Sequence, residues 1–225
     1  MKLLKLMLVT GLLIAACQNK SVKLPVLDVT GIQDTIYNNT QVWIFFELQG
    51  NDTITKLNRN NTVSTTHWVY NIDRRLTLKQ IVPHLQDLFA KREKPSLHQS
   101  EEPVNNYFSY VDTLSNRLSM VLFNNTEFIT DKSYTKDPDS INITANTRDM
   151  LIRQSPSGIY LDSELITADN IQKELLKLKD TSRLNVHLIF DKNLSYQDYM
   201  HLKAILQNVK DDSIYIDEKE YVLLN

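Results

Sequence analysis

Two segments of this 225-residue chain follow the same pattern without a gap. Residues 68–82 read WVYNIDRRLTLKQIV, and residues 186–200 read VHLIFDKNLSYQDYM. The separation is constant at 118 positions, so that Asp73 aligns with Asp191 (191 − 73 = 118). Each segment opens with residues that favour a β-strand and continues with an aspartate and a basic residue. An internal repeat of this kind predicts two structurally related units within one chain.

The part of each repeat that follows the aspartate predicts a capped helix. Thr77 is followed at the third position by Gln80, and Ser195 by Asp198, which is the spacing of a capping box. Pro83 comes after the first turn of the first helix, where it should kink that helix or delay its start. The sequence therefore predicts a strand, an aspartate turn and a capped helix in both halves.

The remaining apolar pattern predicts an α+β fold of two related modules in tandem, each a two-layer mixed sheet with helices on one face. The last strand, Tyr221–Leu224, is expected at a sheet edge, where it could pair with a second copy in a homodimer. The other expected strands include 42–48, 53–57, 62–72, 107–111, 118–123, 186–190 and 214–216, with an extra helix after Thr167. The expected organisation is a signal peptide at 1–16, a tether at 17–36, modules at 37–130 and 141–225, and a linker at 131–140.

The N-terminus has the pattern of a secretory signal rather than of a folded element. Lys2 and Lys5 precede an apolar run that contains no acidic residue and is too short to span a bilayer comfortably. The run ends in Ile14-Ala15-Ala16-Cys17, which resembles the bacterial lipobox. Cys17 is therefore the predicted lipidation site and membrane anchor. Because Gln18 rather than aspartate follows Cys17, the outer membrane is favoured over the inner one, with the protein facing the periplasm.

Composition argues against several classes of function. The formal net charge is −2, which lacks the basic footprint of a nucleic-acid-binding protein. The four glycines are too far apart for a phosphate-binding loop, and a single cysteine excludes an intrachain disulfide and a cysteine metal cluster. No cofactor, metal ion or nucleic acid is therefore expected.

The titratable residues give no catalytic pattern. No two of the five histidines have the i, i+4 spacing of a helical zinc site. Asp73 and Asp191 follow strands and precede helices, where a carboxylate stabilises turn N–H groups and the positive helix start. No catalytic residue is predicted. A deep cleft lined by Asp191, His187 and other ionisable groups would instead indicate an enzyme.

The C-terminal module resembles the periplasmic domain of the ExbD/TolR family. The residues that carry the resemblance are Ile159–Asp162, Ile166-Thr167, Ile189–Lys192 and Leu194–Asp198. The similarity covers about 141–225, and the repeat extends a degenerate form of it to the first half. The matching positions are folding residues rather than catalytic ones.

The resemblance implies a binding role. Members of the family are non-enzymatic partners of a proton-driven motor, and their periplasmic domains dimerise and contact TonB-like proteins or peptidoglycan. This chain lacks their transmembrane helix with its essential aspartate, so the energy-coupling role does not transfer. The expected function is that of a non-enzymatic cell-envelope lipoprotein that binds a protein or cell-wall partner. The resemblance links this role to TonB/Tol-type envelope systems. The alternative is an exported lipoprotein enzyme or small-ligand-binding protein with a similar αβ layer.

Overall fold

The computed structural model describes residues 21–50, 52–58, 62–94, 103–130, 143–144, 147–179 and 183–223. The predicted signal peptide 1–16, the lipidation site Cys17 and the predicted linker 131–140 lie outside the described residues. None of the helices in the described part of the chain is long and apolar enough to cross a membrane.

The first half of the chain forms a six-stranded mixed sheet with one helix, which confirms the predicted α+β class. The strands follow the order β1-β5-β4-β2-β3, and β6 pairs with β5. Their bounds are β1 Val26–Leu27, β2 Asn39–Gln49, β3 Asp52–Leu57, β4 His67–Ile72, β5 Asn106–Asp112 and β6 Arg117–Leu122, and the helix is α2, Leu78–Glu93.

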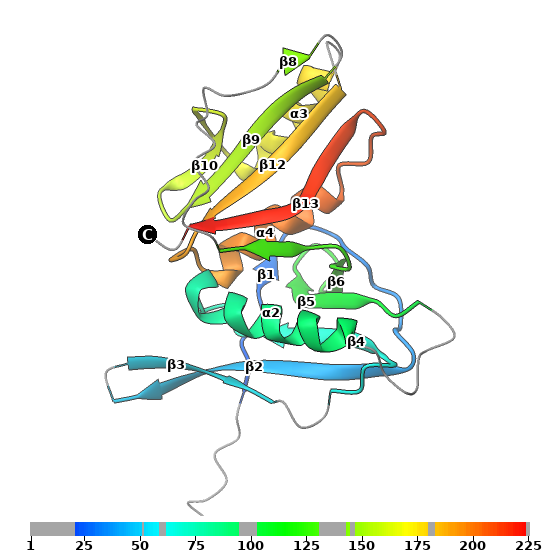
Figure 1. Ribbon diagram of the computed structural model, residues 1–225, viewed down its shortest axis with the longest axis vertical. Helices are drawn as coiled ribbons and strands as arrows, with labels where there is room; N and C mark the ends of the chain where they lie inside the picture. The colour runs from blue at the N-terminus through cyan, green and yellow to red at the C-terminus, as the bar shows by residue number, and fades with distance from the viewer. Residues whose placement is uncertain are drawn as a thin grey trace, which may run out of the picture.

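The second half is built on a seven-stranded sheet with two helices (Figure 1). Its strand order is β11-β10-β9-β12-β13-β7, and β8 pairs with β9. The strands are β7 Glu127–Ile129, β8 Ile143–Thr144, β9 Thr147–Ser155, β10 Gly158–Leu161, β11 Glu164–Ile166, β12 Arg183–Asp191 and β13 Ile214–Leu223, and the helices are α3, Ala168–Lys179, and α4, Tyr196–Gln207.

The two halves share one topology, as the repeat predicts. In the first module the order β3-β2-β4-β5 combines an antiparallel hairpin with two parallel steps, and α2 connects β4 to β5. In the second module β10-β9-β12-β13 repeats this arrangement, with α4 as the connecting helix. The fold is therefore two related modules in tandem. The second module adds α3 and β11, which have no counterpart in the first.

The modules are joined where their repeat helices begin. The N–H of Leu78 donates to the carbonyl of Leu194 at 3.0 Å, and the N–H of Tyr196 donates to the carbonyl of Leu76 at 2.7 Å. A second pair of bonds has the same symmetry, from Lys79 to Lys192 at 2.8 Å and from Gln197 to Arg74 at 3.3 Å. Within each pair of bonds, the donor and the acceptor of one bond are the repeat mates of the donor and the acceptor of the other bond. The modules are thus related by a pseudo-two-fold axis, as two copies of one chain are in a symmetric dimer.

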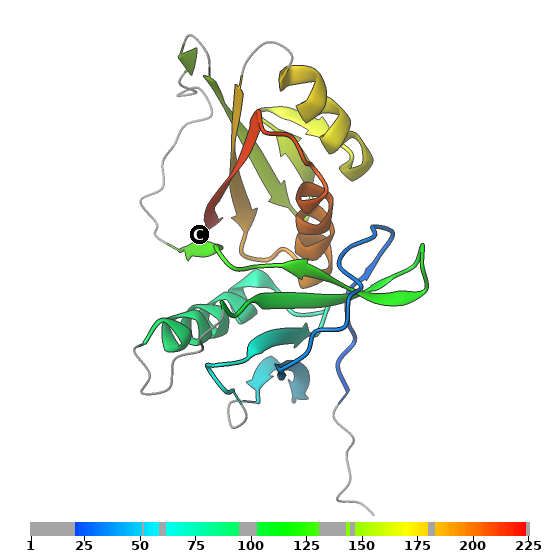
Figure 2. The ribbon, with the colours of Figure 1, turned by 90° about the vertical axis from the view of Figure 1, so that its right-hand side faces the viewer.

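A single hydrophobic core runs through both modules. Tyr199 of α4 lies 6.2 Å from the ring of Phe123 and 6.3 Å from that of Phe128, which both belong to the first half of the sequence, and 5.0 Å from Phe190 of its own module. β7 leaves the first half and pairs in parallel with β13 (Figure 2). Each module therefore completes part of its core with residues of the other.

Several details differ from the sequence expectations. The helix α2 begins at Leu78, where the capping box at Thr77 is formed, and it continues through Pro83 in its second turn, so Pro83 does not delay its start. The strand expected from residue 62 begins at His67, after a turn. The two closing strands are one strand, β13, whose register against β12 shifts between Val186 and Leu188.

Two further segments, one expected at a sheet edge and one expected to be a tether, differ from the sequence expectations. Tyr221 does not lie on a free edge, because β7 pairs with residues 219–221 of β13. The expected tether 17–36 is largely part of the fold, because β1 pairs with β5 and the N–H of Lys23 donates to Asp73 Oδ2 at 3.1 Å. In the first place a strand from the first half completes the second sheet, and in the second place a segment expected to be a tether completes the first sheet.

Candidate binding cleft between the modules

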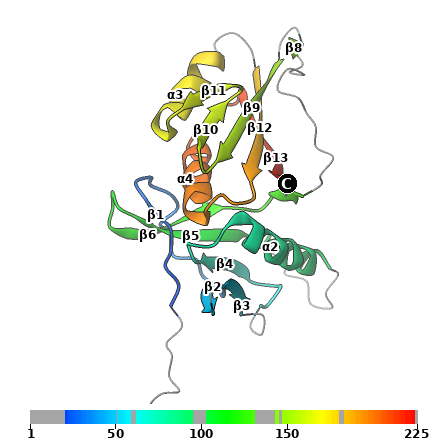
Figure 3. The same cartoon turned by 90° about the vertical axis from the view of Figure 1, so that its left-hand side faces the viewer.

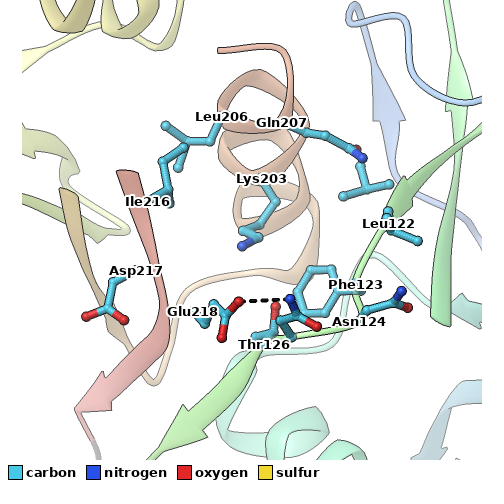
Figure 4. Close-up of a pocket in the computed structure, with 12 residues that line it drawn as sticks. Leu122, Phe123, Asn124, Thr126, Lys203, Leu206, Gln207, Ile216, Asp217 and Glu218 are labelled. Atoms are coloured by element: carbon cyan, nitrogen blue, oxygen red, sulfur yellow. Dashed lines mark hydrogen bonds between the residues drawn. The ribbon is translucent and has the colours of Figure 1, made fainter. Parts of the chain in front are cut away.

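A cleft of about 320 Å³ lies where the two modules meet (Figure 4). One wall comes from the segment between β6 and β7, and the other from α4 and β13. Its lining combines apolar side chains, amides and acids: Leu122, Phe123, Asn124, Thr126, Lys203, Leu206, Gln207, Ile216, Asp217 and Glu218. The cleft exists because β7 departs from the first sheet to join the second, so the sequence repeat alone does not predict it.

A buried charged cluster lies beneath the cleft. Glu220 of β13 is fully buried, and it accepts hydrogen bonds from Tyr199 Oη at 2.6 Å and from Lys203 Nζ at 2.5 Å. The ammonium of Lys203 also lies 4.9 Å from the ring centre of Phe123. Burial, and in addition the charge of Glu220, raise the pKa of Tyr199 well above its ordinary value, so its hydroxyl remains a donor.

This cluster is better suited to positioning the cleft wall than to chemistry. The charge of Lys203 is already neutralised by Glu220, so it offers little net positive charge to a ligand. Of the two acidic residues that line the cleft, Glu218 is held by Asn125 Nδ2 at 2.8 Å, and the carboxylate of Asp217 is directed to His187 Nδ1 at 2.9 Å. The cleft is therefore acidic at its rim and apolar on its walls.

The wall formed by β13 exposes strand backbone. The N–H of Leu184 donates to the carbonyl of Ser213, so in this parallel ladder the polar backbone groups of residues 213 and 215 face β12. The backbone groups of Ile216 and the carbonyl of Ile214 then face the opposite edge, whereas the N–H of Ile214 donates to the carbonyl of Asp211 at 3.0 Å. β7 covers that edge only at residues 219–221. In the described structure the β13 edge at Ile216 consequently faces the cleft without a neighbouring strand.

An apolar surface leads into the cleft from the β5–β6 hairpin. Leu122 is 40% exposed and lines the cleft, and Leu118, four positions earlier on the same face of β6, is 51% exposed. Val111 lies directly opposite Leu118 and is 38% exposed. Exposed aliphatic side chains on one face of a hairpin next to a cleft are typical of a surface that binds another polypeptide.

The two repeated aspartates have the turn-forming roles that the sequence predicts. Asp73 Oδ1 accepts from the N–H of Arg75 at 3.1 Å, and Asp191 Oδ1 accepts from the N–H of Asn193, the repeat mate of Arg75, at 2.7 Å. Asp73 is fully buried and also holds the Arg75 guanidinium, with Nη2 2.7 Å from Oδ2. Burial raises the pKa of Asp73, but the hydrogen bonds from Arg75 and Lys23 together lower it by more. The net result is a pKa below the usual value of an aspartate.

His187 and Asp191 are not brought together in a cleft. His187 lies on the open face of the second sheet, with Nδ1 2.9 Å from Asp217 Oδ2 and Nε2 3.5 Å from Asp149 Oδ1. His201 Nε2 lies 3.2 Å from Asp28 Oδ1 on the segment after β1. Within the described residues, no group of histidine, cysteine, aspartate and glutamate side chains is arranged to hold a metal ion.

A larger cleft of about 730 Å³ lies within the second module, between β9–β11 and α3. Its principal charges pair with each other, since Arg148 Nη2 lies 3.3 Å from Asp162 Oδ2. Asp162 also accepts from the N–H of Leu151 at 2.9 Å, so its carboxylate fixes the β10–β11 turn. These contacts give the paired charges of Arg148 and Asp162 a structural role.

Comparison with known proteins adds no relative: no family model, no curated protein and no solved structure matches this chain. The resemblance to the ExbD/TolR family therefore rests on the sequence pattern alone.

Proposed function

We propose that this protein is a non-enzymatic cell-envelope lipoprotein that binds an extended segment of a partner protein in the cleft between its modules. The observation that carries the proposal is the unpaired edge of β13 at Ile216, which faces a cleft lined by both modules. An exposed strand edge can take an additional strand, with the backbone supplying hydrogen bonds and the neighbouring side chains supplying selectivity.

The residues that line the cleft define the kind of partner segment that fits in it. Leu122, Leu206 and Ile216 offer an apolar surface to the side chains on one face of an added strand. Glu218 favours a basic side chain near the point where β7 begins. We therefore expect an extended segment that combines aliphatic residues with a lysine or arginine, rather than an acidic segment.

The lipobox and the family resemblance agree with this role. A lipid on Cys17 would hold the modules at a membrane, where an envelope protein could present such a segment. The repeated aspartates support a non-enzymatic protein, because Asp73 and Asp191 are both engaged in turn hydrogen bonds. The ExbD/TolR resemblance predicts binding of envelope proteins or cell wall.

The experiment is site-specific photo-crosslinking in the cells that make the protein. A photoreactive amino acid at Gln207, on the rim of the cleft, should give an adduct that is sensitive to protease. The same amino acid at Leu165, which is 66% exposed on a different edge, should not. Introducing Leu122→Asp should abolish the Gln207 adduct, and the matched change Leu165→Asp should leave it intact.

Two outcomes would contradict the proposal. Equal adducts at Gln207 and Leu165 would mean that the cleft has no selective partner. An adduct at Gln207 that resists protease but is removed by a muramidase would identify cell wall rather than a protein as the ligand.

A further inference from the structure

The β2–β3 hairpin carries aromatic side chains on the face of the sheet that α2 does not cover. Val42 and Ile44 are fully buried on the helix side, so Trp43 and Phe45 point to the opposite face. Their rings lie 6.3 Å apart and nearly parallel, at 17°. Both are only partly buried.

The neighbouring strand extends this surface. Lys56 lies directly opposite Phe45, and Ile54, which is 36% exposed, lies opposite Glu47 on the same face. Lys56 Nζ and Glu47 Oε2 are 3.9 Å apart, so the two charges largely balance. We call Trp43, Phe45, Ile54 and Lys56 the aromatic hairpin face. An indole, a phenyl ring and an aliphatic side chain next to a lysine form the combination found at membrane–water interfaces.

The chain enters the fold beside this face. The N–H of Lys23 donates to Asp73 Oδ2, and the N–H of Arg74 donates to the carbonyl of Lys23 at 2.8 Å. The N–H of Asp73 in turn donates to the carbonyl of Ile44, which lies between Trp43 and Phe45 in β2. The described N-terminal segment lies on the side of the sheet opposite α2 (Figure 3).

The short connection to Cys17 limits the distance to a membrane. Lys23 follows Cys17 by only six positions, which span at most about 20 Å when fully extended. A lipid on Cys17 would therefore hold Lys23, and the hairpin beside it, close to the bilayer. The length and attachment point of this segment select the face that meets the membrane.

We infer that the aromatic hairpin face docks on the phospholipid surface in which the Cys17 lipid is anchored. This inference rests on the lipid anchoring in the proposed function. Trp43 and Phe45 enter the interfacial region, and Lys56 reaches the phosphate layer. Docking fixes the orientation of the modules relative to the membrane.

Tryptophan fluorescence of the lipidated full chain in vesicles tests the inference. The chain has two tryptophans, and Trp68 is fully buried, so a membrane quencher reports on Trp43. We expect vesicles of phosphatidylethanolamine and phosphatidylglycerol with brominated acyl chains to quench the wild type. Trp43→Phe should remove this quenching. Phe45→Ser should reduce it, whereas Tyr215→Ser, which changes an exposed aromatic residue of the second module, should not.

The results separate docking from lipidation. A chain that floats with the vesicles but whose Trp43 remains unquenched and accessible to acrylamide would overturn the docking inference and leave the anchor intact. A chain that does not float would instead overturn the lipid anchor. Protection of Trp43 from acrylamide that depends on protein concentration and occurs in detergent without vesicles would show that a second copy covers this face, and would also overturn the inference.

Discussion

Thr77 and Ser195, which occupy the same position in the two repeats, pair with each other in an isolated antiparallel bridge. Thr77 is the N-cap residue of α2, and Ser195 is the N-cap residue of α4. Four backbone hydrogen bonds surround this pair in two symmetric sets. The junction of the modules is therefore built from the same residues that make the modules similar.

The first prediction concerns this junction. Lys79→Pro removes one inter-module N–H donor at an exposed position in the first turn of α2, where the helix itself does not use that donor. We expect the free energy of unfolding to fall by about 1 kcal/mol relative to Lys79→Ala, as measured by urea denaturation. The comparison of Asp169→Pro with Asp169→Ala, at the equivalent second position of α3, controls for the strain that a proline introduces. Equal losses at both sites would contradict a stabilising role for the symmetric bonds.

The second prediction concerns acid stability. The folded-state pKa of Asp73 is lowered, so its contribution is complete above the unfolded-state value of about 3.9 and is lost as the pH falls through the folded value. Asp73→Asn should destabilise the protein by about 2 kcal/mol at pH 7, and this difference should shrink below about pH 4. Denaturant titrations at several pH values measure it. Asp191→Asn, the partly exposed repeat mate, should have a smaller effect. A constant difference down to pH 2 would rule out the ionised Asp73 as the cause.

The third prediction concerns the independence of the C-terminal module. The sequence pattern predicts that residues 139–225 fold alone, but Tyr199 packs on Phe123 and Phe128 from outside that range, and β7 pairs with β13. We expect the isolated fragment 139–225 to lack a cooperative thermal transition, because it exposes this aromatic surface. Mixing it with residues 21–130 should restore the transition. Calorimetry that shows a sharp melt of the fragment alone would contradict a shared core.

The fourth prediction concerns the anchor. Cys17→Ser removes the only thiol and with it the predicted lipid attachment. The variant should appear in the soluble fraction or remain unprocessed, because the acyl chains, worth about 0.8 kcal/mol per buried CH₂, are lost. Membrane fractionation and intact-mass measurement test it, with Gln18→Ser as the neighbouring control. A variant that matures and fractionates like the wild type would disprove lipidation at Cys17.

The sequence by itself determined the local structure of this protein. The repeated aspartate strings predicted strand, turn and helix in both halves, because capping boxes and aspartate turns depend on residues within a few positions of each other. It also assigned Asp73 and Asp191 to turns, and the structure confirms those hydrogen bonds.

Only the tertiary structure decided how the halves combine. The sequence predicts no strand around Phe128, and Val26–Leu27 falls in the expected tether, yet both form strands. These strands are only two or three residues long, so they carry no periodic signal, and their stability comes from partners that are distant in sequence. The cleft and its unpaired β13 edge follow from where those short strands end. For that reason the candidate site lay outside what the pattern of residues could predict.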